Sequence, residues 1–133
     1  MLEKINPTKE THPLILIVED HTDLRVRLHS WLGILYTQYQ IYEAQSAEDA
    51  LDTIKEYPVD LILMDIGLPG MNGIEATQII KQLNPKMKII VTTQLAGTEH
   101  EQAALKAGAA AFIPKDQLFR ALVPAMDQLL SAE

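Results

Sequence analysis

The sequence predicts an α/β domain in which a doubly wound, five-stranded parallel sheet is covered by helices on both faces. Five short segments rich in Leu, Ile and Val recur along the chain, and each is followed by apolar residues at helical spacing. The connections are short enough for local crossovers only, and strand–helix–strand crossovers produce parallel strands. With 133 residues, of which 47% are hydrophobic, the chain is large enough for one domain with its own core.

The five predicted strands are LILIV (14–18), QIYEA (40–44), DLILM (60–64), KIIVT (88–92) and AFI (111–113). The first, third and fourth are apolar on both faces, which is typical of strands in the middle of a parallel sheet. The second mixes polar and apolar residues, and the fifth runs into Pro114, which lacks an amide hydrogen. Both therefore suit the edges of the sheet, which predicts the strand order 2-1-3-4-5.

Five helices are predicted after the strands. In the first helix, a spacing of four, three and four residues predicts one apolar face, formed by Leu24, Leu28, Trp31 and Leu35. Trp31 is therefore predicted to lie in the core. The others are predicted over residues 46–57, 73–83, 98–107 and 116–130. Ser46 is a candidate N-cap with Asp49 three residues later, while Pro58 and Gly108 each end a helix.

Composition argues against several classes of function. The formal charge of −7 and the pI near 5.0 argue against direct nucleic-acid binding, because phosphate backbones are bound through clustered Lys and Arg. The absence of cysteine fits a reducing compartment, and no apolar run is long enough to span a membrane. We expect a cytoplasmic protein with no membrane partner, in which residues 1–13 form a flexible tail and residues 14–131 form the domain.

Acidic residues end two neighbouring strands of the predicted sheet. The first strand runs into Glu19 and Asp20, and the third runs into Asp65. In open parallel sheets the functional crevice lies at the carboxyl ends of the strands, where the strand order reverses. Two like charges about 5 Å apart repel by roughly 3 kcal/mol at an effective dielectric of about 20, so the cluster calls for a cation or a raised pKa. Oxygen ligands of this kind suit Mg²⁺.

The other strand ends add complementary chemistry. The fourth strand delivers Thr93, whose hydroxyl can donate to an oxyanion, and the fifth delivers Lys115, a point charge suited to phosphate. A carboxylate nucleophile, a divalent cation, a hydroxyl and a lysine together indicate phosphoryl transfer to Asp65. The glycines at 67 and 70 let the backbone turn closely around the new group.

These residues resemble the receiver domain of response regulators in two-component signalling. The resemblance covers residues 14 to about 130 and rests on VED (18–20), MDIGLPGMNGIE (64–75), Thr93 and GAAAFIPKD (108–116). It implies a flavodoxin-like three-layer sandwich that accepts a phosphoryl group from a sensor histidine kinase or a histidine phosphotransfer protein. It also implies that the domain catalyses only its own phosphorylation and dephosphorylation, so that it is not an enzyme in the usual sense.

The resemblance also implies roles for single residues. Asp65 would be the phosphoacceptor. Mg²⁺ would be bound by Asp20, by Asp65 and by the backbone carbonyl of Gly67, while Glu19 would act mainly through a bound water.

A switch would connect this site to an output face. Thr93 and Lys115 would contact the phosphoryl group, and Phe112 would be the aromatic residue whose rotamer follows Thr93. The movement would reshape the face formed by the last two helices and the last strand, and the same face is a candidate homodimer interface. The segment EDHTDLRVRL resembles receivers fused to helix-turn-helix DNA-binding domains, which implies transcriptional output through an effector domain outside this chain.

Three positions depart from the family pattern. Gln94 stands where a small residue is usual, Asp116 follows Lys115 where a cis proline is usual, and Glu19 replaces the commoner Asp. These departures put access to the site and the shape of the last loop in question. Gln94 also favours one alternative, a free-standing or degenerate receiver that acts as a protein-binding module.

Two other classes remain as alternatives. A flavin-binding electron carrier shares the strand order, but it calls for Ser, Thr and Gly after the first strand, where this chain has EDHTD. A phosphatase with an aspartyl nucleophile calls for a second acid two residues after Asp65, where this chain has Gly67.

Overall fold

The computed structural model describes residues 13–94 and 97–131, and this part of the chain confirms the predicted α/β fold. One sheet of five parallel strands has the order β2-β1-β3-β4-β5. The strands are β1 (Leu14–Val18), β2 (Gln40–Ala44), β3 (Leu61–Asp65), β4 (Lys88–Thr93) and β5 (Ala111–Pro114). The helices are α2 (Thr22–Leu35), α3 (Ala47–Glu56), α4 (Gly73–Leu83), α5 (Thr98–Ala107) and α6 (Leu118–Leu130), with a 3-10 turn η2 (Lys115–Gln117) before α6. The predicted tail, apart from Pro13, lies outside the described residues.

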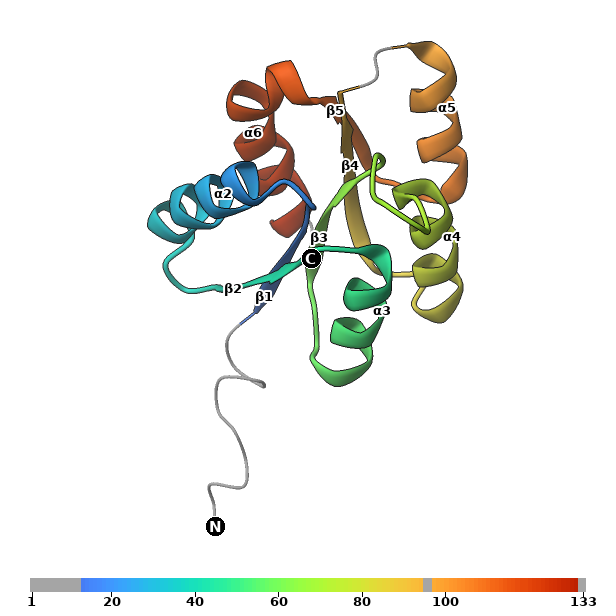
Figure 1. Cartoon of the computed structure of the whole chain (residues 1–133). Coiled ribbons are helices and arrows are strands. Elements are labelled where there is room, and N and C mark those ends of the chain that lie inside the picture. The colour runs from blue at the N-terminus through green and yellow to red at the C-terminus, as the bar shows by residue number, and fades with distance from the viewer. Residues whose placement is uncertain (1–12, 95–96, 132–133) are drawn as a thin grey trace.

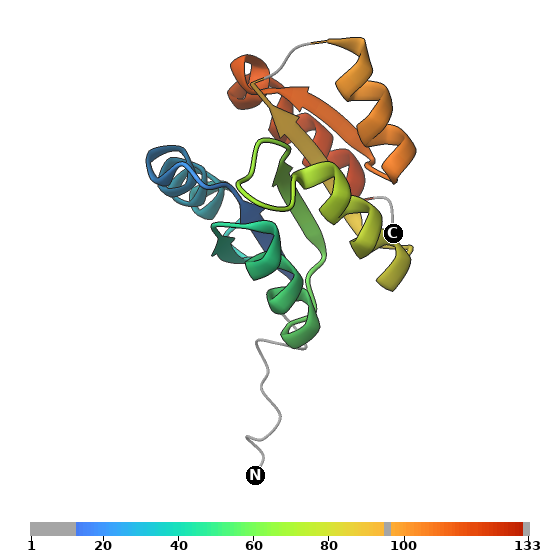
Figure 2. The ribbon, with the colours of Figure 1, turned by 45° about the vertical axis from the view of Figure 1, so that its right-hand side comes forward.

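The sheet lies between two layers of helices. Helices α2 and α6 cover one face, and α3, α4 and α5 cover the other (Figures 1 and 2). Alternate residues of β1 face opposite layers: Leu16 packs with α3 and α4, whereas Ile17 packs with α2 and α6. Full burial of each such side chain stabilises the folded state by about 1.5–3 kcal/mol. A central strand with apolar residues at every position is therefore stabilised by packing against both helix layers.

The predicted face of the first helix was partly wrong. Leu28 and Leu32 are buried and belong to the core between α2, α6 and the sheet, whereas Leu35 is 49% exposed. Leu35 is the last residue of α2, and residue spacing predicts a face without showing how far along the helix its neighbours extend. Trp31 is half-buried against this core, with its ring 4.8 Å from that of Phe119 in α6.

The last helix begins later than predicted. Residues Lys115–Gln117 form a 3-10 turn, and the α-helix starts at Leu118, which is buried. Such turns are frequent at the starts of α-helices, and no periodicity rule separates them from the helix that follows. The third strand ends at Asp65 rather than at residue 64, so the acid is part of the strand itself.

The fourth and fifth strands each extend one residue beyond the prediction, to Thr93 and Pro114, and two predicted helix ends are confirmed. Ser46 Oγ accepts a hydrogen bond from Asp49 N at 3.1 Å, as expected for an N-cap, and Gly108 ends α5 in the left-handed conformation with φ +115°. None of the described helices has the length and apolar character needed to cross a membrane.

Candidate functional site

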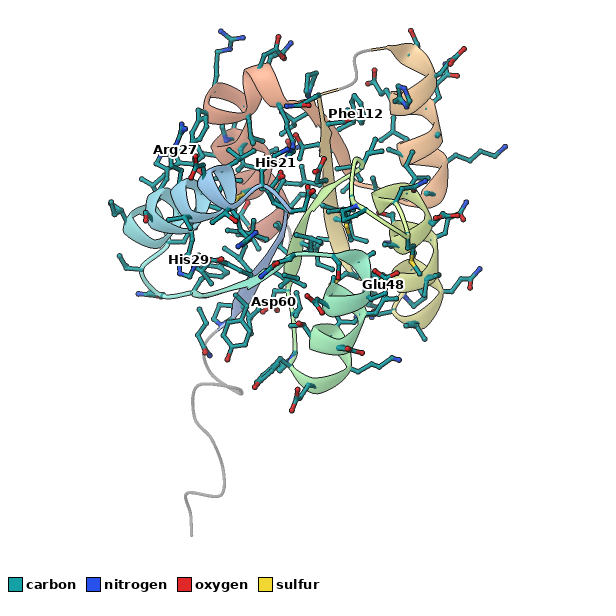
Figure 3. All side chains as sticks on the ribbon, viewed as in Figure 1. His21, Arg27, His29, Glu48, Asp60 and Phe112 are labelled. Atoms are coloured by element: carbon teal, nitrogen blue, oxygen red, sulfur yellow. The ribbon has the colours of Figure 1, made fainter. Side chains whose placement is uncertain are left out.

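The predicted convergence of carboxylates is confirmed at the carboxyl edge of the sheet. Strands β1 and β3 are neighbours in register, with Val18 opposite Met64, so the residues that follow them meet. Glu19, Asp20 and Asp65 each contribute one oxygen to a group of atoms that lie within 4.8 Å of one another. His21 contributes a ring nitrogen to the same group, which sequence reasoning did not expect. Figure 3 labels His21 where the chain enters α2.

Backbone contacts hold Asp65 in place. It pairs with Thr92 of β4, and Ile66 N donates to Thr92 O at 2.9 Å. The chain then returns so close that a Cβ at Gly73 would lie 2.1 Å from the Asp65 carbonyl oxygen, so only glycine fits at the start of α4. Gly67 N donates to Asp65 Oδ1 at 3.1 Å, which orients the carboxylate.

Lys115 brings a positive charge to the cluster from the end of β5, the edge strand that lies two places beyond β3. Its Nζ lies 2.9 Å from Glu19 Oε1 and 3.3 Å from Asp65 Oδ2, and its side chain is only 11% exposed. The 3-10 turn directly after β5 places this side chain over the end of the sheet. Lys115 therefore pairs with two carboxylates from two different strand ends.

Burial and neighbouring charges shift the pKa values of these groups. Burial and the nearby Glu19 raise the pKa of the Asp65 carboxyl, against the opposing effect of Lys115. Burial also acts to raise the pKa of Glu19, but Lys115 and the hydrogen bonds from His21 outweigh it, so this pKa is lowered. Burial acts to lower the pKa of Lys115, but the two carboxylates outweigh it and raise this pKa. Glu19 and Lys115 are therefore both charged at neutral pH. The repulsion that Lys115 does not compensate disfavours the ionised form of Asp65.

The charges and the oxygen atoms of this cluster fit a divalent cation. With all groups ionised, three carboxylates and one ammonium leave a net charge of −2. Three carboxylate oxygens with almost no exposure accept no hydrogen bond from the described residues: Glu19 Oε1, Asp20 Oδ1 and Asp65 Oδ2. Lys115 is near two of them but only at ion-pairing geometry. Hard oxygen ligands of this kind are those that Mg²⁺ prefers.

A small pocket opens beside Asp65. It has a volume of about 200 Å³ and is lined by His21, Asp65, Gly67, Thr93, Gln94 and Lys115. Because a water molecule takes about 30 Å³ in the liquid, this volume holds several groups of that size. Thr93 is buried at 1% exposure, whereas Gln94, the unusual residue after it, is exposed at the rim. The sequence-predicted residues Asp65, Thr93 and Lys115 thus share one pocket.

Phe112 lies away from that pocket. It is half-buried, packs against the core on the α4 and α5 side, and lines a separate hollow of about 470 Å³ with Thr98 and Glu101 of α5 (Figure 3). Its strand neighbour is Val91, two residues before Thr93. Asp116 lies in the 3-10 turn, and the described part of the chain contains no cis peptide bond.

Sequence reasoning missed two further residues that support the acidic loop. Arg25 in α2 donates from Nη1 to the Glu19 carbonyl oxygen at 2.9 Å and from Nε to Glu43 Oε1 at 2.9 Å. One signal was present, because Arg25 lies next to Leu24 and three residues before Leu28, on the face predicted to be apolar. A charged residue at a core-facing position needs a charged or polar partner, but the sequence alone did not identify Glu43.

Comparison with known proteins identifies the family. Residues 15–127 match the model of the response regulator receiver domain. The chain belongs to the response regulator receiver domain family. Such domains are signalling modules of two-component systems, and they bind Mg²⁺ through an acidic pocket and interact with histidine kinases or phosphotransfer proteins.

Individual relatives of this receiver domain differ in length. Chemotaxis protein CheY of Halobacterium salinarum is 34% identical over 119 residues, which cover 89% of this chain and 97% of that protein. Transcriptional activator protein ExaE of Pseudomonas putida is 34% identical over 101 residues, or 76% of this chain but only 47% of ExaE. Response regulator GacA of Pseudomonas aeruginosa is 28% identical, and the match covers 90% of this chain and 56% of GacA. The receiver chain therefore spans about half the length of these two regulators.

Solved structures agree with the receiver fold. A two-component response regulator of the LuxR family from Aurantimonas sp. SI85-9A1 has a TM-score of 0.84 at 29% identity, covering 92% of this chain and 88% of that one. A CheY-like receiver domain protein from Methanospirillum hungatei JF-1 has a TM-score of 0.74 at 30% identity, covering 92% of this chain and all of that one.

Proposed function

We propose that this receiver domain is the phosphoacceptor of a two-component phosphorelay and that Asp65 takes the phosphoryl group. The supporting observation is the meeting of a buried Asp65 with two other acids and Lys115 at one pocket. A carboxylate that is buried among like charges is costly to a fold unless the site has a use for it. The proposed donor is a sensor histidine kinase or a histidine phosphotransfer protein.

The proposed reaction uses groups that already lie in the pocket. An Asp65 carboxylate oxygen attacks the phosphorus of a phosphohistidine, a new P–O bond forms, and the P–N bond breaks with its electron pair left on the imidazole. Lys115, which lies 3.3 Å from Asp65 Oδ2, then pairs with the transferred oxygens, and the buried Thr93 hydroxyl donates to them. Hydrolysis of the resulting acyl phosphate returns the domain to its starting state.

The residues proposed to hold Mg²⁺ are Asp20, Asp65 and the carbonyl of Gly67, with Glu19 acting through water. A bound Mg²⁺ would offset the charge that repels one anion from another when the carboxylate meets the phosphoryl group. Glu19 also pairs directly with Lys115, so it holds the lysine as well. This second role limits how far the lysine can move before phosphorylation.

Intact-mass measurement with a small-molecule phosphodonor tests the proposal. Acetyl phosphate with Mg²⁺ is expected to add one phosphoryl group to the wild-type chain and none to Asp65→Asn. Asp52→Asn is a matched control, because Asp52 is an exposed acid on α3 away from the pocket. An equal adduct on Asp65→Asn would refute the assignment of the acceptor.

We further propose that phosphorylation acts through Phe112 on the face of α5, β5 and α6, and that the output is regulation of transcription by an effector domain. Support comes from two relatives that are named as a transcriptional activator and as a transcriptional regulatory protein, in which the match covers 47% and 52% of the longer protein. The CheY match, which covers 97% of that protein, supports the alternative of a free-standing receiver. The coding sequence after codon 133 in the parent gene distinguishes the two.

A further inference from the structure

Arg25 is a buried cation on a helix face that otherwise contacts the core. It is 7% exposed and lies in α2, one residue after Leu24 and three before Leu28. A guanidinium in such a position is costly unless its donors are satisfied by well-placed acceptors. It donates to the Glu19 carbonyl oxygen and to the Glu43 carboxylate, so it joins the acidic loop to strand β2.

The contact to Glu19 acts on the backbone of the acidic loop. Glu19 N donates to Ala44 O at 3.0 Å, and Glu19 O accepts from Arg25 Nη1 at 2.9 Å. The oxygen that accepts from Arg25 belongs to the peptide that joins Glu19 to Asp20. Its orientation therefore sets the direction in which both carboxylates leave the chain.

Glu43 holds the guanidinium in turn. It lies on β2 opposite Ile17 of β1, and its two carboxylate oxygens accept from Arg25 Nε at 2.9 Å and contact His29 Nδ1 at 2.6 Å. Figure 3 shows His29 on the side of α2 that faces β2, and Arg27 on the outer side of the helix. The guanidinium of an arginine is planar and donates in fixed directions, so it can hold two acceptors in a set orientation. The ammonium of a lysine can also meet two acceptors, but it does not fix their directions.

We propose that Arg25, anchored by Glu43, is a positioning residue that fixes the Glu19–Asp20 peptide and so preorganises the acidic pocket for a divalent cation. The inference rests on the proposed function, because it assigns a role in the same pocket. Arg25 itself touches neither the cation nor the phosphoryl group. Its effect passes through a backbone carbonyl, as outer contacts of metal sites commonly act on the ligands.

Charge and geometry predict opposite results when Arg25 is removed. If Arg25 acted only by its positive charge, Arg25→Met would leave the pocket more negative and would tighten Mg²⁺ binding. If Arg25 positions the loop, the same substitution weakens Mg²⁺ binding. Arg25→Lys separates the two further, because it keeps the charge and loses the fork.

The experiment measures Mg²⁺ affinity by isothermal titration calorimetry and amide hydrogen exchange of residues 19–21 in the metal-free protein. Arg25→Met is expected to weaken Mg²⁺ binding about 10-fold, which is typical for loss of an outer contact that orients a metal ligand. Arg25→Lys is expected to weaken it less, and both should speed exchange at residues 19–21. Arg27→Met, an exposed arginine on the same helix, removes the same charge and is expected to leave both measurements unchanged.

Unchanged or tighter Mg²⁺ binding in folded Arg25→Met, or unchanged exchange at residues 19–21, would overturn the proposal. Thermal unfolding monitored by circular dichroism establishes that each variant is folded. If Arg25→Met does not fold, Arg25→Lys and Glu43→Ala decide by the same two measurements. If the wild-type chain itself binds no Mg²⁺, the proposed function fails, while the exchange data still test the contact between Arg25 and the loop.

Discussion

Asp65 is a buried acid whose ionised form is only partly compensated by its surroundings. It is 2% exposed at the end of a buried strand, close to Glu19, and its pKa is raised by burial and by that neighbour. Lys115 offsets the repulsion only in part, because it is shared with Glu19. The site is therefore less stable without a cation than a neutral site of the same shape would be.

Asp65→Asn is expected to raise the melting temperature in the absence of divalent cations by about 4 °C at neutral pH, which corresponds to about 1 kcal/mol in a domain of this size. Because the pKa of Asp65 is raised in the folded state, the folded protein binds this proton more readily than the unfolded chain. The free energy of unfolding therefore falls as pH rises through the raised pKa of Asp65, where the folded protein loses this proton. The increase in melting temperature caused by Asp65→Asn should accordingly become smaller as pH falls.

Melting curves in EDTA from about pH 4 to about pH 8 check this dependence, since the interval starts at the ordinary carboxyl range. Asp52→Asn is the control, because it removes a charge of the same type from an exposed site. A melting temperature below wild type for Asp65→Asn at neutral pH would contradict the crowding of charges around this residue.

Lys115→Met is expected to have the opposite effect. It removes the ammonium that pairs with Glu19 and Asp65, so the free energy of unfolding in EDTA should fall by about 2 kcal/mol, less than for a fully buried pair. Mg²⁺ should then raise the melting temperature of this variant by more than that of wild type, because the remaining cluster is more negative. Lys106→Met, an exposed lysine on α5, should behave as wild type in a fluorescence melt with and without Mg²⁺. Equal Mg²⁺ shifts for Lys115→Met and wild type would argue against the pairing.

At the scale of elements, the start of α4 approaches the end of β3 very closely. A Cβ at Gly73 would meet the Asp65 carbonyl oxygen at 2.1 Å, so Gly73→Ala must displace backbone at the site. We expect a loss of about 2 kcal/mol in stability, as for overpacking, and slower phosphorylation by acetyl phosphate. Gly33 in α2 has no neighbour within 4 Å of such a Cβ, and Gly33→Ala should stabilise by about 0.5–1 kcal/mol. Urea unfolding of the two alanine variants would contradict this contrast if both changed stability in the same direction.

The predictability of the elements depends on which force formed them. The first and third strands were predicted because both of their faces are buried, and a short, continuous apolar run such as 14–18 is typical of a strand inside a parallel sheet. The face of α2 was partly mistaken because Leu35 satisfies the spacing but ends the helix. The 3-10 turn at Lys115–Gln117 was missed because it follows from the path of the chain after β5, which local residue preferences do not specify.

At the scale of the whole molecule, the site follows from the strand order. Residues 19, 65 and 115 are far apart in sequence and meet only because β1 and β3 are adjacent and β5 lies two strands beyond β3. That order was predictable from the apolar pattern, and so were the three acids, Thr93 and Lys115. The pairing of Arg25 with Glu43 was not predictable, because it depends on how α2 is rotated over β2. The sequence placed Arg25 on the apolar face of the helix but did not indicate its partner.

If a divalent cation is held by these strand ends, its binding must stabilise the entire fold. A ligand that binds only the folded state stabilises it by RT ln(1 + [L]/Kd), or about 2.7 kcal/mol at a concentration of about 100 Kd. The melting temperature of the wild-type chain should therefore rise steadily with Mg²⁺ concentration. Asp20→Asn should remove most of that rise, because it removes the negative charge of a proposed ligand and replaces one of its two oxygens with an amide group. Asp23→Asn, on the exposed first turn of α2, should retain it. Calorimetric scans at constant ionic strength set by KCl separate binding from screening, and a rise of equal size in Asp20→Asn would show that the cation acts elsewhere.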